Sequence, residues 1–373
     1  MLGAAHGIKG VLEDKLYDMA QEDPAELDLM KYTPSSALGS CRYKLADPDV
    51  DDTDYQRILE IFKKYNVRYF FYNGGNDSMD TCNKISKYMQ KVGYECRIMG
   101  VPKTIDNDLN GTDHCPGFAS AAKYIATSCA EVWQDAHVYD TGMVTIIEIM
   151  GRHAGWLAGS AALASLTGCG PDLVYLPETD FDMDRFLSDV KAVYDKTGKC
   201  MVAVSEGIHY ADGTFVSEAK TSATDGFGHA QLAVWPHAGR DREAEAGGQG
   251  PRHRALPAPA LRVPSGLQDR CGGGISGRPG CGEAAAEGFT DKMVAFQCTR
   301  DGSYECKTVL EPLDIVANFE KKVPRAWINE AGNGVTQEFI DYVLPLIQGE
   351  TDAPKENALP RFARLKKVLT TSL

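Results

Sequence analysis

Hydrophobic and polar positions between residues 55 and 210 alternate between strand-like and helix-like patterns. Short apolar runs bounded by glycine or polar residues predict strands, and longer stretches with apolar residues at helical spacing predict helices. The alternation favours a mainly parallel sheet covered by helices on both faces. We predict strands at 67–73, 95–101, 143–149, 173–176 and 200–205, and helices at 117–133, 153–166 and 182–196.

The first predicted strand leads directly into a helix. The strand 67–73 (VRYFFYN) ends at Gly74 and Gly75, and residues 78–92 then carry apolar side chains on one helical face. We predict that Asp77 or Ser78 is the N-cap of this helix, because both residue types cap helices well. Ligands of such folds bind at the carboxyl ends of the strands.

Residues 233–288 interrupt the pattern. Gly, Pro, Ala and Arg fill most of this stretch, and no lysine occurs between Lys220 and Lys292. One interpretation is a disordered linker, because few large apolar residues are available to offset the entropy of ordering. The other is a reading frame lost near Leu232 and recovered near Gly288, which we favour because long structureless insertions in compact domains are uncommon. We expect no regular structure in this stretch.

Composition indicates a soluble globular protein. The 373 residues are 43% hydrophobic and 24% charged, which suits two ordinary domains. A net charge of -13 argues against a nucleic-acid or anionic-membrane partner, since both need a basic surface. A small-molecule substrate is therefore expected.

The cysteines and the start of the sequence indicate a cytoplasmic protein. The eleven cysteines show no Cys-x-x-Cys pair and no metal-like spacing, so we expect reduced, mostly buried thiols. No apolar stretch follows Met1 as a signal peptide would require, and no window approaches the roughly 18 apolar residues of a membrane span.

Residues 74–78 (GGNDS) are the first candidate site. Backbone N–H groups and the positive end of the helix dipole meet where a strand-end glycine pair precedes a helix, and they favour an anion. An ordinary glycine turn is the alternative.

Residues 102–108 (PKTIDND) are the second candidate site. Asp106 and Asp108 flank an amide close to a hydroxyl and a lysine, and such crowding suits a cation or a reacting hydroxyl. A solvated Asx-turn is the alternative.

Two further strand ends carry polar residues. Arg152 follows the strand 143–149, where a guanidinium suits a phosphate or a carboxylate, although a surface arginine is equally compatible. Glu206 follows the strand 200–205, where a carboxylate could hold sugar hydroxyls.

The stretches GGNDSMDT, PKTIDNDL and EIMGRHAGWLAG, with SEG at 205–207, resemble the phosphofructokinase family in order and spacing. The resemblance covers residues 1–231 and resumes near residue 289. It implies a two-lobed α/β enzyme that transfers a phosphoryl group to fructose 6-phosphate with Mg2+, and a homo-oligomer, either a dimer or a tetramer.

The resemblance also implies a division of the chain. Residues 1–117 would form the donor lobe, 118–232 the fructose 6-phosphate lobe, and 289–373 a segment that completes both lobes. The family's first strand and glycine-rich loop, resembling GGxxPGxN, would lie upstream of Met1. Its Gln-Arg motif for the sugar phosphate would fall within 233–288.

Roles follow from the match to the family's motifs. Asp106 would be the catalytic base that takes the proton of the sugar O1 hydroxyl, and Lys103 and Asp77 would be the other catalytic positions. Asn76 stands where many relatives carry a metal-associated aspartate. The sugar-binding positions would be Thr104, Ile105, Asp108, Met150, Gly151, Arg152 and Glu206. The donor-binding positions would be Gly74, Gly75, Ser78 and, in SSALGSCRYKL, Arg42.

Two of these positions concern the phosphoryl donor. Members that use ATP resemble GGDGS and PGTIDND, with glycine where this chain has Asp77 and Lys103. The carboxylate of Asp77 would occupy nucleotide space, and Lys103 would supply a cation to pyrophosphate oxygens. The chain therefore resembles the pyrophosphate-dependent members, which implies a reversible reaction of glycolysis and gluconeogenesis. An ATP-dependent enzyme and an inactive fragment remain the alternatives.

Overall fold

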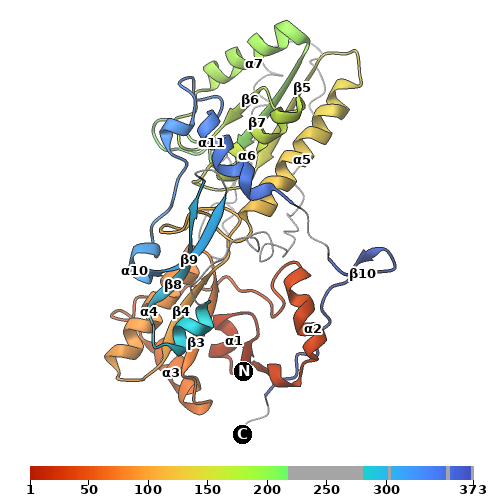
Figure 1. Cartoon of the computed structure of the whole chain (residues 1–373). Coiled ribbons are helices and arrows are strands. Elements are labelled where there is room, and N and C mark those ends of the chain that lie inside the picture. Colours follow the sequence, from red (N-terminus) through yellow and green to blue (C-terminus); the bar gives the residue numbers. More distant parts are fainter. Residues whose placement is uncertain (217–279, 301–303, 350–352, 371–373) are drawn as a thin grey trace.

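The computed structural model describes residues 1–216, 280–300, 304–349 and 353–370. These residues form two lobes, each built on a sheet that is mainly or wholly parallel (Figure 1). The fold is the two-lobed α/β arrangement expected from the sequence.

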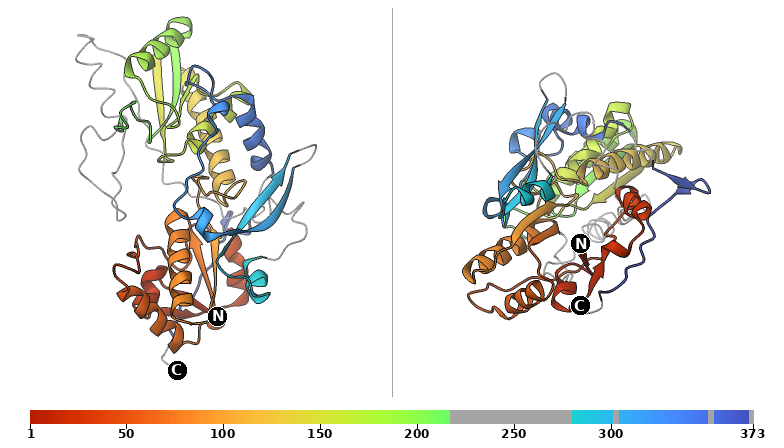
Figure 2. Two further views of the ribbon diagram at one scale, coloured as in Figure 1. Left: turned by 90° about the vertical axis from the view of Figure 1, so that its left-hand side faces the viewer. Right: turned by 60° about the horizontal axis from the view of Figure 1, so that its bottom comes forward.

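The first lobe contains a sheet of order β3-β4-β8-β9. The strands β3 (Tyr69–Gly74), β4 (Arg97–Pro102) and β8 (Lys292–Thr299) are parallel, and β9 (Glu305–Pro312) runs antiparallel to β8. Four helices of this lobe are α1 (Ile8–Leu12), α3 (Thr53–Lys64), α4 (Asn76–Lys91) and α10 (Leu313–Val316). The hairpin of β8 and β9 extends from this sheet toward the other lobe (Figures 1 and 2).

The second lobe contains a fully parallel sheet of order β5-β7-β6. Its strands are β5 (Met143–Ile149), β6 (Leu173–Tyr175) and β7 (Lys199–Ser205). Its helices are α5 (Phe118–His137), α6 (Trp156–Ser160), α7 (Met183–Thr197) and α11 (Gln337–Val343), with a 3-10 helix at Ala161–Thr167. The predicted strands and the helices 117–133 and 182–196 agree with these elements apart from shifts at their ends. The predicted helix 153–166 is instead a short α-helix that continues as a 3-10 helix, and α11 was not predicted.

Both faces of the second sheet are buried. Met201 and Ala203 of β7 belong to the core shared with α5, α6 and α11, whereas Val202 and Val204 belong to the core shared with α7. Successive strand residues point to opposite faces, so the apolar run of β7 serves two cores at once.

The ends of the described chain lie together in the first lobe. The strands β1 (Leu2–Ala4) and β2 (Leu16–Asp18) form an antiparallel pair. The backbone N–H of Asp18 donates to the carbonyl of Val368 at 2.9 Å, so the C-terminal residues run along β2. The remaining elements are α2 (Pro24–Asp28), β10 (Lys355–Glu356) and β11 (Leu359–Pro360).

The expectation for residues 233–288 needs one correction. Residues 233–279 lie outside the described residues, but 280–288 are described and include the helix α9 (Cys281–Ala286). Ala284 and Ala285 are buried in a cluster with Met99 of β4, and Leu310 packs against that cluster. Regular structure therefore resumes before Gly288, because these small side chains fit closely against the first sheet.

No helix in the described part of the chain is long and apolar enough to cross a membrane. The ten cysteines within that part are free thiols, and six of them are buried: Cys82, Cys96, Cys115, Cys129, Cys200 and Cys306.

Candidate active site

The two loops predicted to carry the chemistry of the first lobe leave the same edge of its sheet. The parallel pairing of β3 and β4 sets Gly74 opposite Pro102, and the backbone N–H of Lys103 donates to the carbonyl of Gly74 at 2.9 Å. A Cβ atom added to Gly75 would lie 3.6 Å from the Cβ of Thr104. The residues GGNDS and PKTIDND are therefore neighbours in space.

The helix α4 begins two residues earlier than predicted. Gly75 is its N-cap, with an extended backbone, and its carbonyl accepts from the N–H groups of Ser78 and Met79 at 3.0 Å each. The prediction of Asp77 or Ser78 as N-cap is wrong because glycine can also hold this position without a side-chain bond. Asp77 and Ser78 instead lie in the first helical turn, where the helix dipole is positive.

Three buried oxygen atoms near these loops have no hydrogen-bond partner among the described residues. They are Oδ1 of Asn76, Oδ1 of Asp106 and Oδ1 of Asp108. The side chains are connected, since Nδ2 of Asn76 donates to Oδ2 of Asp108 at 2.8 Å. Buried polar atoms are rarely left without a partner, so these oxygens indicate a ligand. The loop is not the solvated turn considered as the alternative.

Burial governs the pKa of both carboxylates. It raises the pKa of Asp108 to about 7, and the nearby charge of Asp106 adds to the effect. Burial also raises the pKa of Asp106, although the positive charge of Arg152 acts against it. A shift that combines burial with a charged neighbour is typical of functional carboxylates.

The loops of the second lobe also converge. The parallel pair β5 and β7 sets Ile149 opposite Ser205, so the residues after both strands emerge at one edge. Oε1 of Glu206 accepts the N–H groups of Gly151 at 3.0 Å and Arg152 at 3.1 Å. Arg152 has a φ of 50°. A non-glycine residue in this region is strained, and such strain gathers at functional sites.

The loop after β4 connects the two groups of residues. The charges of Arg152, Glu206 and Lys103 all affect the pKa of Asp106. Thr104 forms an isolated bridge with Gly117, just before α5, and the side chain of Ile105 packs against the core of the second lobe. Asp106 therefore lies within electrostatic reach of predicted donor residues and of predicted sugar residues.

Three of the predicted site residues have exposed side chains. Lys103 and Arg42 have exposed side chains, and Arg42 lies between Tyr32 and Thr53 in a stretch without helix or strand. Met150 is also exposed. Their contacts with a donor or a sugar stay predictions.

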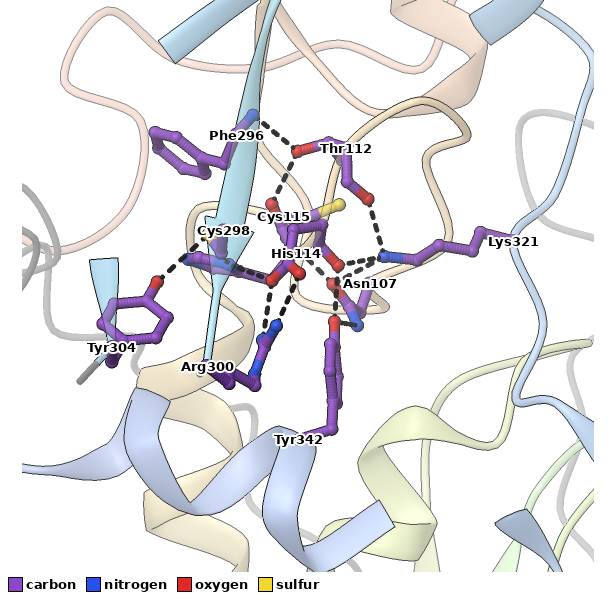
Figure 3. Close-up of polar contacts among 11 residues, drawn as sticks. Asn107, Thr112, His114, Cys115, Phe296, Cys298, Arg300, Tyr304, Lys321 and Tyr342 are labelled. Carbon is purple, nitrogen blue, oxygen red and sulfur yellow. Dashed lines mark hydrogen bonds and ion pairs between the residues drawn. The ribbon is translucent and has the colours of Figure 1, made fainter. Parts of the chain in front are cut away.

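Sequence reasoning missed the residues that hold this loop in place (Figure 3). Asn107 is fully buried, and its backbone has a φ of 58°. Its Oδ1 accepts the backbone N–H of Cys115 at 2.8 Å. Its Nδ2 donates to the hydroxyl of Tyr342 at 2.9 Å, and that hydroxyl donates to the carbonyl of Asp113 at 2.5 Å. Nζ of Lys321 donates to the same carbonyl at 2.6 Å. Asn107 stood out in the motif, but Lys321 and Tyr342 are over 200 residues away and gave no local signal.

Known proteins are similar to this chain in sequence and in fold. A sequence model described as phosphofructokinase matches residues 1–243. The chain is 42% identical over 370 residues to the pyrophosphate--fructose 6-phosphate 1-phosphotransferase of Halomonas elongata, covering 97% of this chain and 87% of that protein. It belongs to the phosphofructokinase family.

Solved structures agree with this assignment. The pyrophosphate-dependent phosphofructokinase of Nitrosospira multiformis superposes with a TM-score of 0.82 at 35% identity, over 99% of this chain and 89% of that one. The pyrophosphate-dependent phosphofructokinase of Marinobacter aquaeolei gives a TM-score of 0.81 at 33% identity, over 99% and 88%. Among the members of the family, the chain is thus similar over nearly its whole length to those named for pyrophosphate.

Proposed function

We propose that this chain transfers a phosphoryl group from pyrophosphate to the O1 hydroxyl of fructose 6-phosphate, giving fructose 1,6-bisphosphate and phosphate. The observation that carries the proposal is the position of Asp106. Asp106 lies in the loop after β4, its buried Oδ1 has no partner among the described residues, and the charges of Arg152 and Glu206 act on its carboxylate. The reaction is reversible, because one phosphoanhydride is exchanged for one phosphoester.

Asp106 acts as the general base of this reaction. A base works best when its pKa lies near the operating pH, and burial raises the pKa of Asp106 in that direction. The backbone N–H of Asp106 donates to Oγ1 of Thr104 at 3.1 Å, which fixes the start of the loop. Proton removal makes the sugar oxygen a better nucleophile, and most of the remaining rate comes from positioning and charge neutralisation.

The free oxygens of Asn76 and Asp108 fit a magnesium ion. Mg2+ prefers carboxylate, amide and water oxygens, and it usually keeps several waters beside one or two protein ligands. Both Oδ1 atoms are buried and without a described partner. The bound ion would neutralise charge on the phosphoryl donor.

Asp77 and Lys103 decide the donor. Asp77 adds a negative charge in the first turn of α4, where a nucleotide would come close, and the exposed Lys103 follows β4 beside Gly74. Similarity to relatives named for pyrophosphate supports the same donor here. Arg42, Gly74, Gly75 and Ser78 would bind that donor. Thr104, Ile105, Met150, Gly151, Arg152 and Glu206 would surround the sugar, with Asp108 close by.

The division into lobes is part of the proposal. Residues 1–117 carry the donor loops, residues 118–232 carry the sugar loops, and residues 289–373 complete both. We also propose a cytoplasmic homo-oligomer.

Steady-state rates with pyrophosphate and with ATP test the donor assignment. The set comprises the wild type, Asp77→Gly, Lys103→Gly and the double variant. We expect the wild type to use pyrophosphate, Asp77→Gly to gain measurable ATP use, and Lys103→Gly chiefly to lose pyrophosphate use. The double variant should show a coupling of about 0.5–3 kcal/mol, as residues that share one ligand do.

The Asp106→Asn variant is the matched control for this set. It should lower turnover with either donor by a factor of about 100–10,000, the usual contribution of a positioned base. A wild type that prefers ATP would make the donor assignment wrong, and no turnover with either donor would favour the inactive alternative.

A further inference from the structure

Two cysteines face each other across the hairpin of β8 and β9. Cys298 and Cys306 are directly opposite in the antiparallel register. Cys306 is 2% exposed, whereas Cys298 is only half-buried. Directly opposed residues have Cβ atoms about 4.5–5.5 Å apart, close to the about 3.5–4.5 Å of a disulfide. A small movement of the strands would therefore join the two thiols.

Polar groups around Cys298 activate its thiol (Figure 3). Sγ of Cys298 lies 3.7 Å from Nδ1 of His114 and 3.4 Å from the hydroxyl of Tyr304. Hydrogen bonding from Cys306 first, and then from His114 and Tyr304, lowers the pKa of the Cys298 thiol to about 6, although burial opposes it. These contacts favour the thiolate of Cys298, and the thiolate is the reactive form of cysteine.

The other charged groups of the cluster are already paired. Both carboxylate oxygens of Asp113 accept from Arg300 at 2.8 Å, and Oδ1 also lies 3.0 Å from Nδ1 of His114. Burial alone would raise the pKa of Asp113, but the hydrogen bonds of Arg300 and His114 lower it below its usual range. The guanidinium of Arg300 also lies 4.6 Å from the ring centre of Tyr342.

This charge balance favours a reactive thiol over a metal ion. Ligand atoms of Asp113, His114 and Cys298 lie within 4.8 Å of one another, which a soft metal could use. However, Arg300 neutralises the carboxylate, and its fixed positive charge would oppose an added cation. The thiol of Cys298 lies beside Nδ1 of His114, and the carboxylate of Asp113 is paired with Arg300.

We propose that Cys298 and Cys306 form a redox-active dithiol, which a hydroperoxide oxidises to a disulfide across the hairpin. The Cys298 thiolate attacks one peroxide oxygen of hydrogen peroxide, giving a sulfenic acid and hydroxide. Sγ of Cys306 then attacks the sulfenic sulfur, and its proton and the sulfenic hydroxyl leave as water. The peroxide takes up the two electrons that the thiols lose.

The dithiol is connected to the loop that carries Asp106. Asp113, beside His114, donates its backbone N–H to the carbonyl of Phe296 in β8 at 2.8 Å. Its own carbonyl accepts from Tyr342 and Lys321, the residues that hold Asn107. A disulfide disturbs the contact of Cys298 with His114, and thereby the position of the neighbouring Asp113. Oxidation should therefore lower activity. That consequence rests on the proposed function, whereas disulfide formation does not.

Peptide mapping tests the proposal on the full chain. Trypsin cleavage after Lys292, Arg300 and Lys307 gives two peptides, 293–300 and 301–307, each with a single cysteine. After reduction, removal of reductant and treatment with hydrogen peroxide, we expect these peptides to be joined, and dithiothreitol to separate them. Cys306→Ser should instead leave a sulfenic acid on Cys298 that a cyclic 1,3-dione traps.

Cys281 provides the matched control thiol. It is also half-buried in the first lobe, but burial raises its pKa to about 11. Iodoacetamide at pH 7 should alkylate Cys298 more than tenfold faster than Cys281, because the pKa of Cys298 is lowered whereas that of Cys281 is raised. Cys281→Ser should leave the joined peptides unchanged, whereas Cys298→Ser should abolish them. His114→Gln should slow the alkylation of Cys298.

Two results would overturn the proposal. One is peroxide treatment that leaves the two peptides separate in the wild type. The other is stoichiometric Zn2+ in the purified wild type that is lost in Cys298→Ser and blocks oxidation, because the cluster would then be a metal centre. Failure of the dithiol leaves the donor assays unaffected, and failure of those assays leaves the peptide map unaffected.

Discussion

Asp106 and Asp108 lie close together and share a buried environment, and the charge of Asp106 makes ionisation of Asp108 harder. Burial is the larger cause of the raised pKa of Asp108, and the charge of Asp106 adds to it. The sequence alone predicted this pair, because two carboxylates two residues apart beside a lysine are costly unless a ligand uses them. It could not predict that burial raises the pKa of both carboxylates, because burial depends on side chains from other parts of the fold.

The raised pKa of Asp108 predicts how stability depends on pH. Its folded pKa of about 7 lies above the ordinary 3.8, so the folded protein holds this proton more tightly than the unfolded chain does. Its contribution to stability is therefore largest below about pH 4, falls as the pH rises, and is lost above about pH 7. Asp108→Asn should remove this fall and stabilise the protein at pH 8 by about 1–4 kcal/mol, at 1.36 kcal/mol per unit of pKa.

Urea unfolding of the wild type and Asp108→Asn at pH 5 and pH 8 measures this difference. Asp140 is exposed, so Asp140→Asn is the control. It should change the free energy of unfolding by no more than about 0.5 kcal/mol at either pH. Mg2+ with pyrophosphate should reduce the advantage of Asp108→Asn, since a bound cation favours the carboxylate. An advantage that is no larger at pH 8 than at pH 5 would show that the folded protein does not bind this proton more tightly in this range, and would contradict the prediction.

At the scale of the elements, the pattern of apolar positions predicted the bounds of strands better than those of helices. The predicted strand 143–149 coincides with β5 (Met143–Ile149), because both faces of the sheet are buried and most of its side chains are apolar and buried, despite Thr145 and Glu148 within the strand. The start of α4 was wrong by two residues because Gly75 caps it through its backbone alone. The helix α9 was missed because its short Ala-rich sequence has no clear apolar face and depends on contact with Met99 and Leu310.

Gly74 and Gly75 differ in what a side chain would meet. A Cβ atom on Gly74 would lie 2.0 Å from Oγ and 2.6 Å from Cβ of Ser78, whereas one on Gly75 meets its nearest atom at 3.6 Å. Gly74→Ala should therefore displace the start of α4 and cost about 1–3 kcal/mol of stability. Gly75→Ala should change stability by less than about 1 kcal/mol, yet raise KM for pyrophosphate because its methyl group lies in the donor loop.

Urea unfolding followed by circular dichroism, together with KM for pyrophosphate, separates the two effects. Each alanine variant serves as the control for the other. Equal losses of stability would mean that Ser78 moves aside freely, and an unchanged KM in Gly75→Ala would place the donor elsewhere.

At the scale of the whole molecule, the site depends on contacts between segments far apart in the sequence. The four motifs and their order predicted both lobes through the family resemblance that they carry. The residues that hold the lobes at the site lie in the C-terminal part of the chain. Lys321 and Tyr342 act on Asn107 from over 200 residues away, and only the folded chain shows that connection.

Tyr342 connects the second lobe to the loop that carries Asp106. Its ring packs in the core of that lobe, and its hydroxyl bonds to Asn107 and to the carbonyl of Asp113. Tyr342→Phe leaves Nδ2 of Asn107 without this partner, which should cost about 1–3 kcal/mol of stability. Asn107 lies between Asp106 and Asp108 with a φ of 58°, so its release should also lower kcat about 10- to 100-fold with little change in KM for the sugar.

The matched control is Tyr175→Phe. Tyr175 is as buried as Tyr342, at 7% exposure for both, and its hydroxyl donates to Asp189 at 2.9 Å within the second lobe, away from the loop after β4. Both variants should lose stability in urea unfolding, because each loses a buried hydrogen bond. Only Tyr342→Phe should lose kcat. If both variants keep the wild-type kcat, Tyr342 stabilises the fold without positioning Asp106, and the loop is held by Lys321 and by the bond from Cys115 to Asn107.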